Sequence, residues 1–279
     1  MKKISRRSFL AAAGLSVAAL ALTACGGSSA STASSVASSA ASSEAASTSA
    51  AAGELTTVEA GKLTMATNAA FPPYEMTTDA GEFEGIDIET AQAIADKLGL
   101  ELQIDDMDFD AALLSVQQGK ADIVMAGVTV TDERKAVMDF SDSYATGIQS
   151  IIVPEGSDIA SPDDLAGKKI GTQRGTTGYI YCSDAFGDDN VVAYDDGLTA
   201  VQALNNGQVD AVVIDNAPAQ EFVAANPGLV ILDTSYAEED YAIGMAKGSS
   251  LEAAVNAALE ELKADGTLQA IVDKYITAE

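Results

Sequence analysis

The sequence predicts an α/β protein whose folded part is divided into two lobes, and three observations indicate this. The chain has 279 residues, 47% of them hydrophobic, which exceeds the size at which one hydrophobic core usually stops growing. Strand-like and helix-like segments alternate from about residue 55 onward, as they do in a parallel α/β sheet. One helix–turn–strand unit also occurs twice, about ninety residues apart. We therefore expect two similar sheets.

Residues 1–25 have the three parts of an export signal. A basic start is followed by an apolar run over 9–22, which is shorter than the roughly 20 residues that a membrane-spanning helix needs. The run ends in Leu22-Thr23-Ala24-Cys25, which resembles the lipobox of bacterial lipoproteins, where the cysteine is lipidated and begins the mature chain. An ordinary cleaved signal followed by an unrelated cysteine is the alternative. The basic segment 5–10 also resembles a twin-arginine motif, so two export routes stay open.

Residues 26–54 are predicted to form a disordered tether. Up to Gly53 they are Gly, Ser, Ala and Thr, apart from Val36 and Glu44, and such a segment buries too little apolar surface to offset its ordering entropy. A random coil of this length reaches about 30 Å. The folded part is therefore expected to move close to a membrane surface.

The first half of the folded part begins with a short apolar strand over 63–66. Apolar residues at spacings of three and four then predict a helix over 87–98, ended by Gly99. A strand over 100–104, a helix over 110–118 ended by Gly119, and a buried strand over 121–126 follow.

In the second half, Ser161-Pro162 is a typical helix start, and the strand over 169–172 runs into a glycine-rich loop. Helical spacing predicts two C-terminal helices, one from Ser249 and one ending at Tyr275, with Gly266 between them. The acidic run over 238–240 is predicted to be a solvated loop.

The repeated unit covers 114–127 and 202–215, and each copy contains a helix end, a glycine, an aspartate and an apolar strand. Ligands of open α/β sheets bind beyond the carboxyl ends of the strands. The two copies place Gly127-Val128-Thr129 and Asp215 at equivalent strand ends, which predicts a cleft there. Chance similarity between two α/β units is the alternative.

Charge and composition exclude several classes of function. Lys+Arg is 15 against Asp+Glu 42, a formal net charge of -27, which would repel nucleic acid. The chain has no histidine and two cysteines, so histidine-based catalysis, a zinc site and a disulfide framework are not expected. We expect no metal and no cofactor. Cys182 is expected to be a buried or half-buried free thiol.

Two arginines remain after removal of the signal, Arg134 and Arg174. Arg134 follows the first repeat and offers a bidentate fork to a carboxylate, with a surface pair to Glu133 or Asp139 as the alternative. The glycine loop over 171–178 exposes backbone N–H groups at a helix start, although the glycines also suit a simple tight turn.

Asp215 is a carboxylate suited to an ammonium group, or to capping the next helix, or to both roles. Phe71, Tyr74 and Phe109 follow strands, either as walls for a ligand side chain or as ordinary packing. An anion site and a cation site with aromatic residues between them would fit a zwitterion.

These residues resemble the extracellular solute-binding proteins of ABC importers, in the branch that binds polar amino acids. The resemblance rests on four segments in the family's order, namely 85–91, 126–134 with 139–141, 168–177, and 210–215. It implies the type II periplasmic-binding-protein fold, with lobe one at 55–150 plus 242–279, lobe two at 151–241, and hinge crossings near 149–153 and 236–243. It also implies a monomer that partners the permease subunits of an importer and is anchored to the outer face of the cell membrane by lipid.

The resemblance further implies roles for individual residues. Arg134, helped by the Thr129 hydroxyl and by backbone N–H groups near Thr129 and Thr177, would hold the ligand α-carboxylate, and Asp215 with the Gly127 carbonyl would hold the α-ammonium. Thr176 is also expected in the binding site. Phe71 and Phe109 would sandwich the ligand side chain, whose end would meet Asn68, Glu75 and Gln173.

Asn68 stands where several binders of basic or amide amino acids carry an acid, and Ile214 is apolar where some relatives are polar. Both departures favour a polar or neutral ligand over a positively charged one. Arg174 lies beside the predicted pocket and is expected to point outward.

The same resemblance leaves two other functions open. Some relatives on this scaffold are dehydratases that act on cyclohexadienyl carboxylates, with a carboxyl group as the acid. A lipoprotein that senses a ligand without transporting it is the second alternative.

Overall fold

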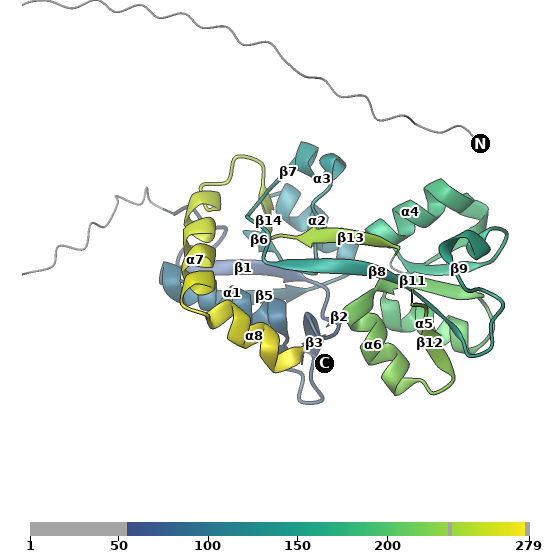
Figure 1. Ribbon diagram of the computed structural model, residues 1–279. Helices are drawn as coiled ribbons and strands as arrows, with labels where there is room; N and C mark the ends of the chain where they lie inside the picture. The colour runs from purple at the N-terminus through teal and green to yellow at the C-terminus, as the bar shows by residue number, and fades with distance from the viewer. Residues whose placement is uncertain (1–54, 234–235, 277–279) are drawn as a thin grey trace, which may run out of the picture. The chain divides into compact units, whose positions relative to one another are not determined.

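The computed structural model describes residues 55–233 and 236–276, in which helices and strands alternate (Figure 1). The predicted signal over 1–25, with Cys25, and the predicted tether over 26–54 lie outside the described residues, Glu54 being the last of the masked N-terminal segment. In chain order the first elements are β1 (Lys62–Thr67), β2 (Ala70–Phe71), β3 (Glu75–Thr77), β4 (Phe83–Glu84), α1 (Ile86–Leu98), β5 (Glu101–Asp106), α2 (Phe109–Gln117), β6 (Ile123–Val124), α3 (Asp132–Val137), β7 (Met138–Phe140) and β8 (Ala145–Pro154). They are followed by η1 (Pro162–Leu165), β9 (Ile170–Gln173), α4 (Thr177–Phe186), η2 (Asp188–Asn190), β10 (Val191–Tyr194), α5 (Gly197–Asn205), β11 (Ala211–Asp215), α6 (Asn216–Ala225), β12 (Leu229–Ile231), β13 (Ala237–Tyr241), β14 (Gly244–Ala246), α7 (Glu252–Ala264) and α8 (Thr267–Tyr275).

The first sheet has the strand order β5-β1-β6-β14-β7, in which β5, β1 and β6 are parallel and β14 is antiparallel to both neighbours. Because side chains of a strand alternate between faces, the residues of β1 divide between two cores. Leu63 and Met65 pack with α1, α7 and α8, while Ala66 packs with α2 on the other face. In Figure 1 the C-terminal helices α7 and α8 lie beside α1. The two C-terminal helices are as predicted, with Gly266 between them.

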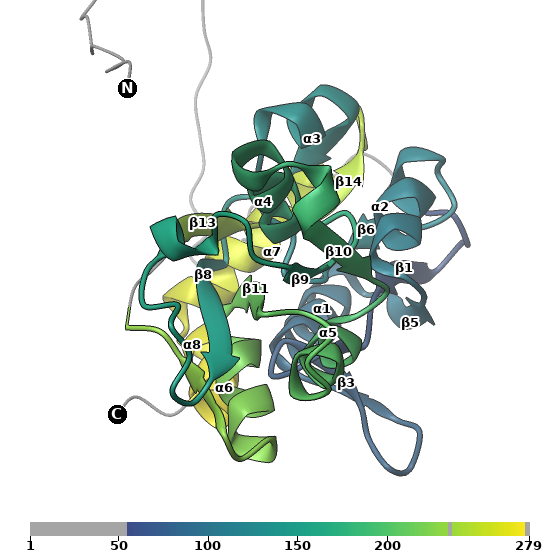
Figure 2. The ribbon, with the colours of Figure 1, turned by 90° about the vertical axis from the view of Figure 1, so that its right-hand side faces the viewer.

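The second sheet has the order β10-β9-β11-β8-β12 and the same parallel start, β10, β9 and β11. Val212 and Ile214 of β11 pack with α5 and α6, whereas Ala211 and Val213 pack with the Cys182 side of α4. Figure 2 shows α4 on one side of these strands and α5 and α6 on the other. Cys182 is a buried free cysteine, as predicted, and burial raises the pKa of its thiol to about 12.

The strands β8 and β13 run antiparallel between the two sheets, with Ala145 opposite Tyr241 and Gln149 opposite Ala237 (Figure 1). The second half of β8 pairs with β11 and β12 instead. The prediction of a solvated loop over 238–240 is wrong, because these residues belong to β13. Strand periodicity leaves Glu238 exposed and buries Glu239, which is 6% exposed.

The two copies of the repeated unit have the same local structure. Each helix is followed by a glycine with positive φ, 65° at Gly119 and 66° at Gly207. Each aspartate then accepts a hydrogen bond from the neighbouring strand, Asp122 from the Thr64 N–H at 2.8 Å and Asp210 from the Lys169 N–H at 2.7 Å. The similarity is therefore structural. The predicted strand over 121–126 is shorter than expected, since only Ile123–Val124 pairs before the chain turns at Gly127, where φ is 55°.

No helix within 55–233 and 236–276 combines the length and the apolar character that a membrane span requires.

Candidate functional site

One cavity brings the predicted binding residues together. The empty space between the residues that line it, including the part open to solvent, is about 440 Å³. All of the predicted ligand-binding residues line it, namely Asn68, Phe71, Glu75, Phe109, Gly127, Thr129, Arg134, Gln173, Thr176, Thr177 and Asp215. The wall also contains residues to which sequence reasoning assigned no role in binding, namely Ala126, Gln149, Val213 and Tyr241, and it includes Ile214.

Arg134 is buried at the wall of the cavity, at 8% exposure. It lies in the first turn of α3, whose N-cap Thr131 accepts a hydrogen bond from the Arg134 N–H. Its Nη1 donates to the Thr129 carbonyl at 2.8 Å and its Nη2 to the Gly175 carbonyl at 3.1 Å. The guanidinium carbon lies 5.4 Å from the centre of the Phe109 ring. The alternative pairing with Glu133 or Asp139 is wrong, since Asp139 binds Lys247. Burial lowers the pKa of Arg134, but a guanidinium remains charged at neutral pH.

A buried carboxylate lies beside the two threonines of the site. Oε2 of Glu239 accepts hydrogen bonds from the Thr129 hydroxyl at 3.0 Å, the Thr177 hydroxyl at 2.9 Å and the Gln149 amide at 3.0 Å. These donors come from the loop after β6, the start of α4 and β8. The hydroxyl protons therefore point to Glu239, and backbone N–H groups at the start of α4 are the donors left for a ligand anion. Only the alternation of β13 could have indicated Glu239 from the sequence.

Asp215 ends β11, and its predicted role as the cap of the next helix is confirmed. Its Oδ1 accepts from the Ala217 N–H at 3.0 Å, so it is the N-cap of α6, and its Oδ2 accepts from the Ile148 N–H at 2.7 Å. The side chain is 2% exposed and lines the cavity. Burial raises the pKa of Asp215 to about 6, against the opposing effect of these two hydrogen bonds. Each carboxylate oxygen keeps acceptor capacity for a cation in the cavity.

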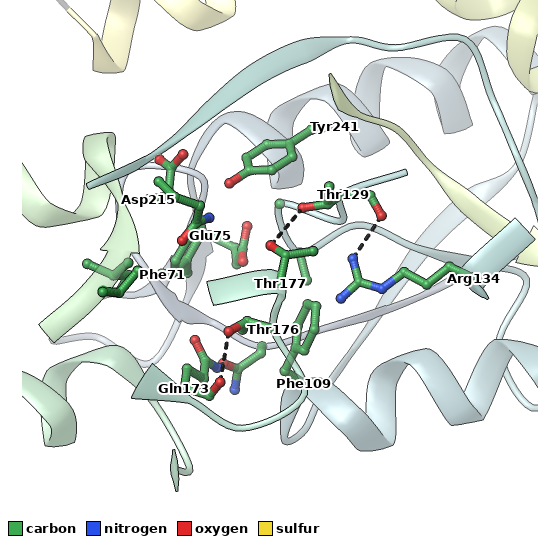
Figure 3. A pocket seen from close by; sticks show the side chains of 16 residues that line it. Phe71, Glu75, Phe109, Thr129, Arg134, Gln173, Thr176, Thr177, Asp215 and Tyr241 are labelled. Atoms are coloured by element: carbon green, nitrogen blue, oxygen red, sulfur yellow. Dashed lines mark hydrogen bonds between the residues drawn. The ribbon is translucent and has the colours of Figure 1, made fainter. Parts of the chain in front are cut away.

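Glu75 is the second acid on the cavity wall, and it is fully buried. Neither of its carboxyl oxygens has a hydrogen-bond partner among the described residues. Burial and, next to it, the neighbouring charge of Asp87 raise the pKa of Glu75 well above its ordinary value. In Figure 3 Glu75, Asp215 and Phe71 lie on one side of the cavity, and Arg134 lies on the opposite side.

Two of the three aromatic residues that the sequence suggested line the cavity, and the third packs in the core. Phe71 and Phe109 line the cavity, as predicted, whereas Tyr74 is in the core and stacks on Phe71 at 5.9 Å between ring centres. Gly127 lies under Phe71 and Tyr241, and a Cβ atom there would come within 2.9 Å of the Phe71 ring. Glycine at this position therefore lets the two rings approach the backbone that lines the site.

Polar side chains close the cavity at another edge. The Gln173 amide donates to Oδ1 of Asn68 at 2.8 Å, and the Asn68 amide donates to the Met107 carbonyl at 3.0 Å. Asn68, which follows β1, is thus hydrogen-bonded to Gln173 of β9. Arg174 points away from the cavity, as expected, and contacts Asp195 at 3.5 Å with 54% of its side chain exposed.

The charges on the wall fit a zwitterion in one orientation. Among the lining residues the ionisable basic and acidic side chains are Arg134, Glu75 and Asp215. An α-carboxylate would be attracted to Arg134 and an α-ammonium to Asp215, because neither buried side chain forms an ion pair with another of the described residues. Within the described residues no group of His, Cys, Asp and Glu is arranged to hold a metal ion.

Comparisons with known proteins identify the family of this chain. The model of the family "Bacterial extracellular solute-binding proteins, family 3" matches residues 63–278, which include every residue that lines the cavity. A probable histidine-binding protein of Neisseria gonorrhoeae is 33% identical over 276 residues, covering 96% of this chain and 95% of the relative.

Two solved structures show the same similarity. The arginine-, lysine-, histidine-binding protein ArtJ of Geobacillus stearothermophilus has a TM-score of 0.75 at 34% identity, covering 78% of this chain and 96% of its own. An ancestral arginine-binding protein bound to glutamine has a TM-score of 0.75 at 42% identity, with 78% and 99% covered.

Proposed function

Because the chain belongs to the bacterial extracellular solute-binding proteins of family 3, we propose that its cavity captures a free L-amino acid for an ABC importer. It has the two-lobed, type II periplasmic-binding-protein fold of its solved relatives. The family and these relatives are substrate-binding proteins of transport systems, and we assign no catalytic residue.

One observation carries this proposal: Arg134 of α3, the helix before β7 of the first sheet, and Asp215, at the end of β11 of the second sheet, line the same cavity. Arg134 holds the α-carboxylate with its remaining N–H donors, helped by backbone N–H groups near Thr129 and Thr177. Asp215 and the Gly127 carbonyl hold the α-ammonium. Phe71 and Phe109 pack against the side chain, whose polar end meets Glu75 and the Asn68–Gln173 pair.

A thermal-shift screen of the purified protein against the twenty amino acids tests this function. Ligand binding raises the free energy of unfolding by RT ln(1 + [L]/Kd), so a millimolar ligand with a micromolar Kd adds about 4 kcal/mol. We expect one or a few amino acids to raise the melting temperature. If all twenty leave it unchanged, the proposed function is wrong.

We further propose that the protein is anchored by lipid on Cys25, which lies outside the described residues, and delivers its ligand to a permease at the same membrane. The lipobox-like segment before Cys25 and the Ser/Ala-rich residues that follow support this. In the Cys25→Ser variant the protein should move from the membrane fraction to the soluble fraction. Ser28→Ala, a neighbouring change outside the lipobox, is the matched control. Continued sedimentation of Cys25→Ser with membranes would exclude the anchor.

A further inference from the structure

Glu75 and Asp87 form a buried acidic pair behind the cavity wall. The chain brings them together at the start of α1, where the Asp87 N–H donates to the Tyr74 carbonyl at 2.8 Å. Gly85 allows this contact, because its φ is 129° and a Cβ atom would lie 2.2 Å from the Tyr74 oxygen. Both acids are 0% exposed.

The pair has few hydrogen-bond donors around it. Asp87 Oδ2 accepts from the Gly127 N–H at 3.0 Å, but its Oδ1 and both oxygens of Glu75 have no partner among the described residues. Neither acid forms an ion pair with any lysine or arginine within 55–233 and 236–276.

The groups that face the pair are acidic or phenolic. They are Asp106 at the end of β5, Asp215 at the end of β11, and the hydroxyls of Tyr74 and Tyr144. No cation faces the pair from these elements, so nothing in the ligand-free site balances two negative charges.

Two adjacent carboxyl groups in a dry site do not both ionise, and they hold one proton between them. Burial raises the pKa of Asp87 to about 6, while the hydrogen bond from the Gly127 N–H opposes the shift. Burial and then the charge of Asp87 raise the pKa of Glu75 well above its ordinary value. The Gly127 N–H favours the ionised form of Asp87, whereas no donor among the described residues reaches Glu75, so the proton resides on Glu75, the member of the pair that lines the cavity.

Once the two backbone charges of an amino-acid ligand are bound, Glu75 is the ionisable residue that remains to contact the ligand side chain. Arg134 takes the α-carboxylate and Asp215 takes the α-ammonium, as in the proposed function on which this inference rests. Asn68, whose position suggested a polar or neutral ligand, is occupied by Gln173 and the Met107 carbonyl. Glu75 is therefore the acid of the cavity wall that is left for a charged ligand side chain.

We propose that Glu75 and Asp87 share one proton in the ligand-free protein, and that an amino acid with a positively charged side chain displaces this proton when it binds. The O–H bond of the Glu75 carboxyl group breaks, the proton passes to solvent, and the ligand cation takes its place beside two carboxylates. A neutral ligand leaves the proton on Glu75, which then donates a hydrogen bond to it.

Isothermal titration calorimetry tests this with three probes: L-arginine, its uncharged isostere L-citrulline, and L-glutamine. Titrations at pH 7.5 in buffers of different ionisation enthalpy give the number of protons released. We expect about one proton for L-arginine and none for the neutral probes. Because binding releases a proton, L-arginine should bind about tenfold more tightly at pH 8 than at pH 7, and the neutral probes should not.

The outcomes separate this inference from the proposed function. If L-arginine binds without proton release, or if only the neutral probes bind, the inference is wrong and amino-acid capture stands. If none of the three probes and none of the twenty amino acids binds, the proposed function fails, and the inference fails with it.

The variant Glu75→Gln tests the residue itself, since it keeps the shape and cannot release a proton. Proton release should disappear and L-arginine binding should weaken by about 30-fold or more, while L-citrulline binding is retained. Glu84→Gln, the same change at an exposed position of β4, should alter neither quantity. If Glu75→Gln does not fold, the wild-type proton count still decides. Proton release from a folded Glu75→Gln protein would overturn the assignment.

Discussion

Replacement of Arg134 by alanine removes the cation on which capture of the ligand depends. In the structure this guanidinium is buried and donates to the carbonyls of Thr129 and Gly175, which leaves part of its five-donor fork for a ligand. Loss of a buried charge partner costs about 2 to 5 kcal/mol of binding free energy. The dissociation constant should therefore rise by about 30-fold to about 5,000-fold.

The same change affects stability, and the two effects can be separated. The carbonyls of Thr129 and Gly175 lose their donor, which costs on the order of 1 to 3 kcal/mol each unless water replaces it. Arg134→Lys keeps the positive charge but not the planar fork, so its binding loss should be smaller than that of Arg134→Ala. Urea unfolding of the ligand-free variants gives the stability term independently of binding.

Calorimetry with L-arginine and L-glutamine measures the binding loss. Arg174→Ala is the matched control, because Arg174 is exposed and its contact with Asp195 is a surface ion pair worth about 1 kcal/mol or less. Its affinity should equal that of the wild type. An unchanged affinity in a folded Arg134→Ala protein would refute the role of this arginine and with it the proposed orientation of the ligand.

Two further predictions concern buried carboxyl groups. The raised pKa of Asp215, about 6, means that the folded state holds a proton between about pH 4 and pH 6 that the unfolded state has released, so stability falls as pH rises through this window. The stability of Asp215→Asn relative to wild type should thus increase by about 2 to 3 kcal/mol from pH 4 to pH 7 in urea unfolding, and a constant difference would contradict the shift. Glu239→Ala should lower the free energy of unfolding by about 2 kcal/mol, because three buried donors lose one acceptor, whereas exposed Glu238→Ala should change it by less than about 0.5 kcal/mol. Equal effects at the two positions would show that the Glu239 network contributes nothing.

Sequence reasoning identified the residues that line the cavity better than it identified their surroundings. Arg134 and Asp215 were recognised because each follows an apolar strand of the repeated unit. The carboxyl ends of parallel strands lie at one edge of a sheet, where ligands bind. Glu239 was assigned to a solvated loop because three successive acids suggest exposure. Its burial depends on the pairing of β13 with β8, which joins residues about ninety positions apart and leaves no local signal.

Local patterns fixed the class of fold, the repeated helix–glycine–strand unit and the ends of most helices, since these depend on side-chain periodicity and on glycines within a few residues. The surroundings of the ionisable residues in the cavity, by contrast, depend on contacts between segments that are distant in the sequence. Asn68 accepts a hydrogen bond from Gln173, Tyr74 packs in the hydrophobic core, and Glu75 and Asp87 are both buried. The energy of a carboxyl group depends on its desolvation and on the charges around it, and both exist only after distant segments have come together.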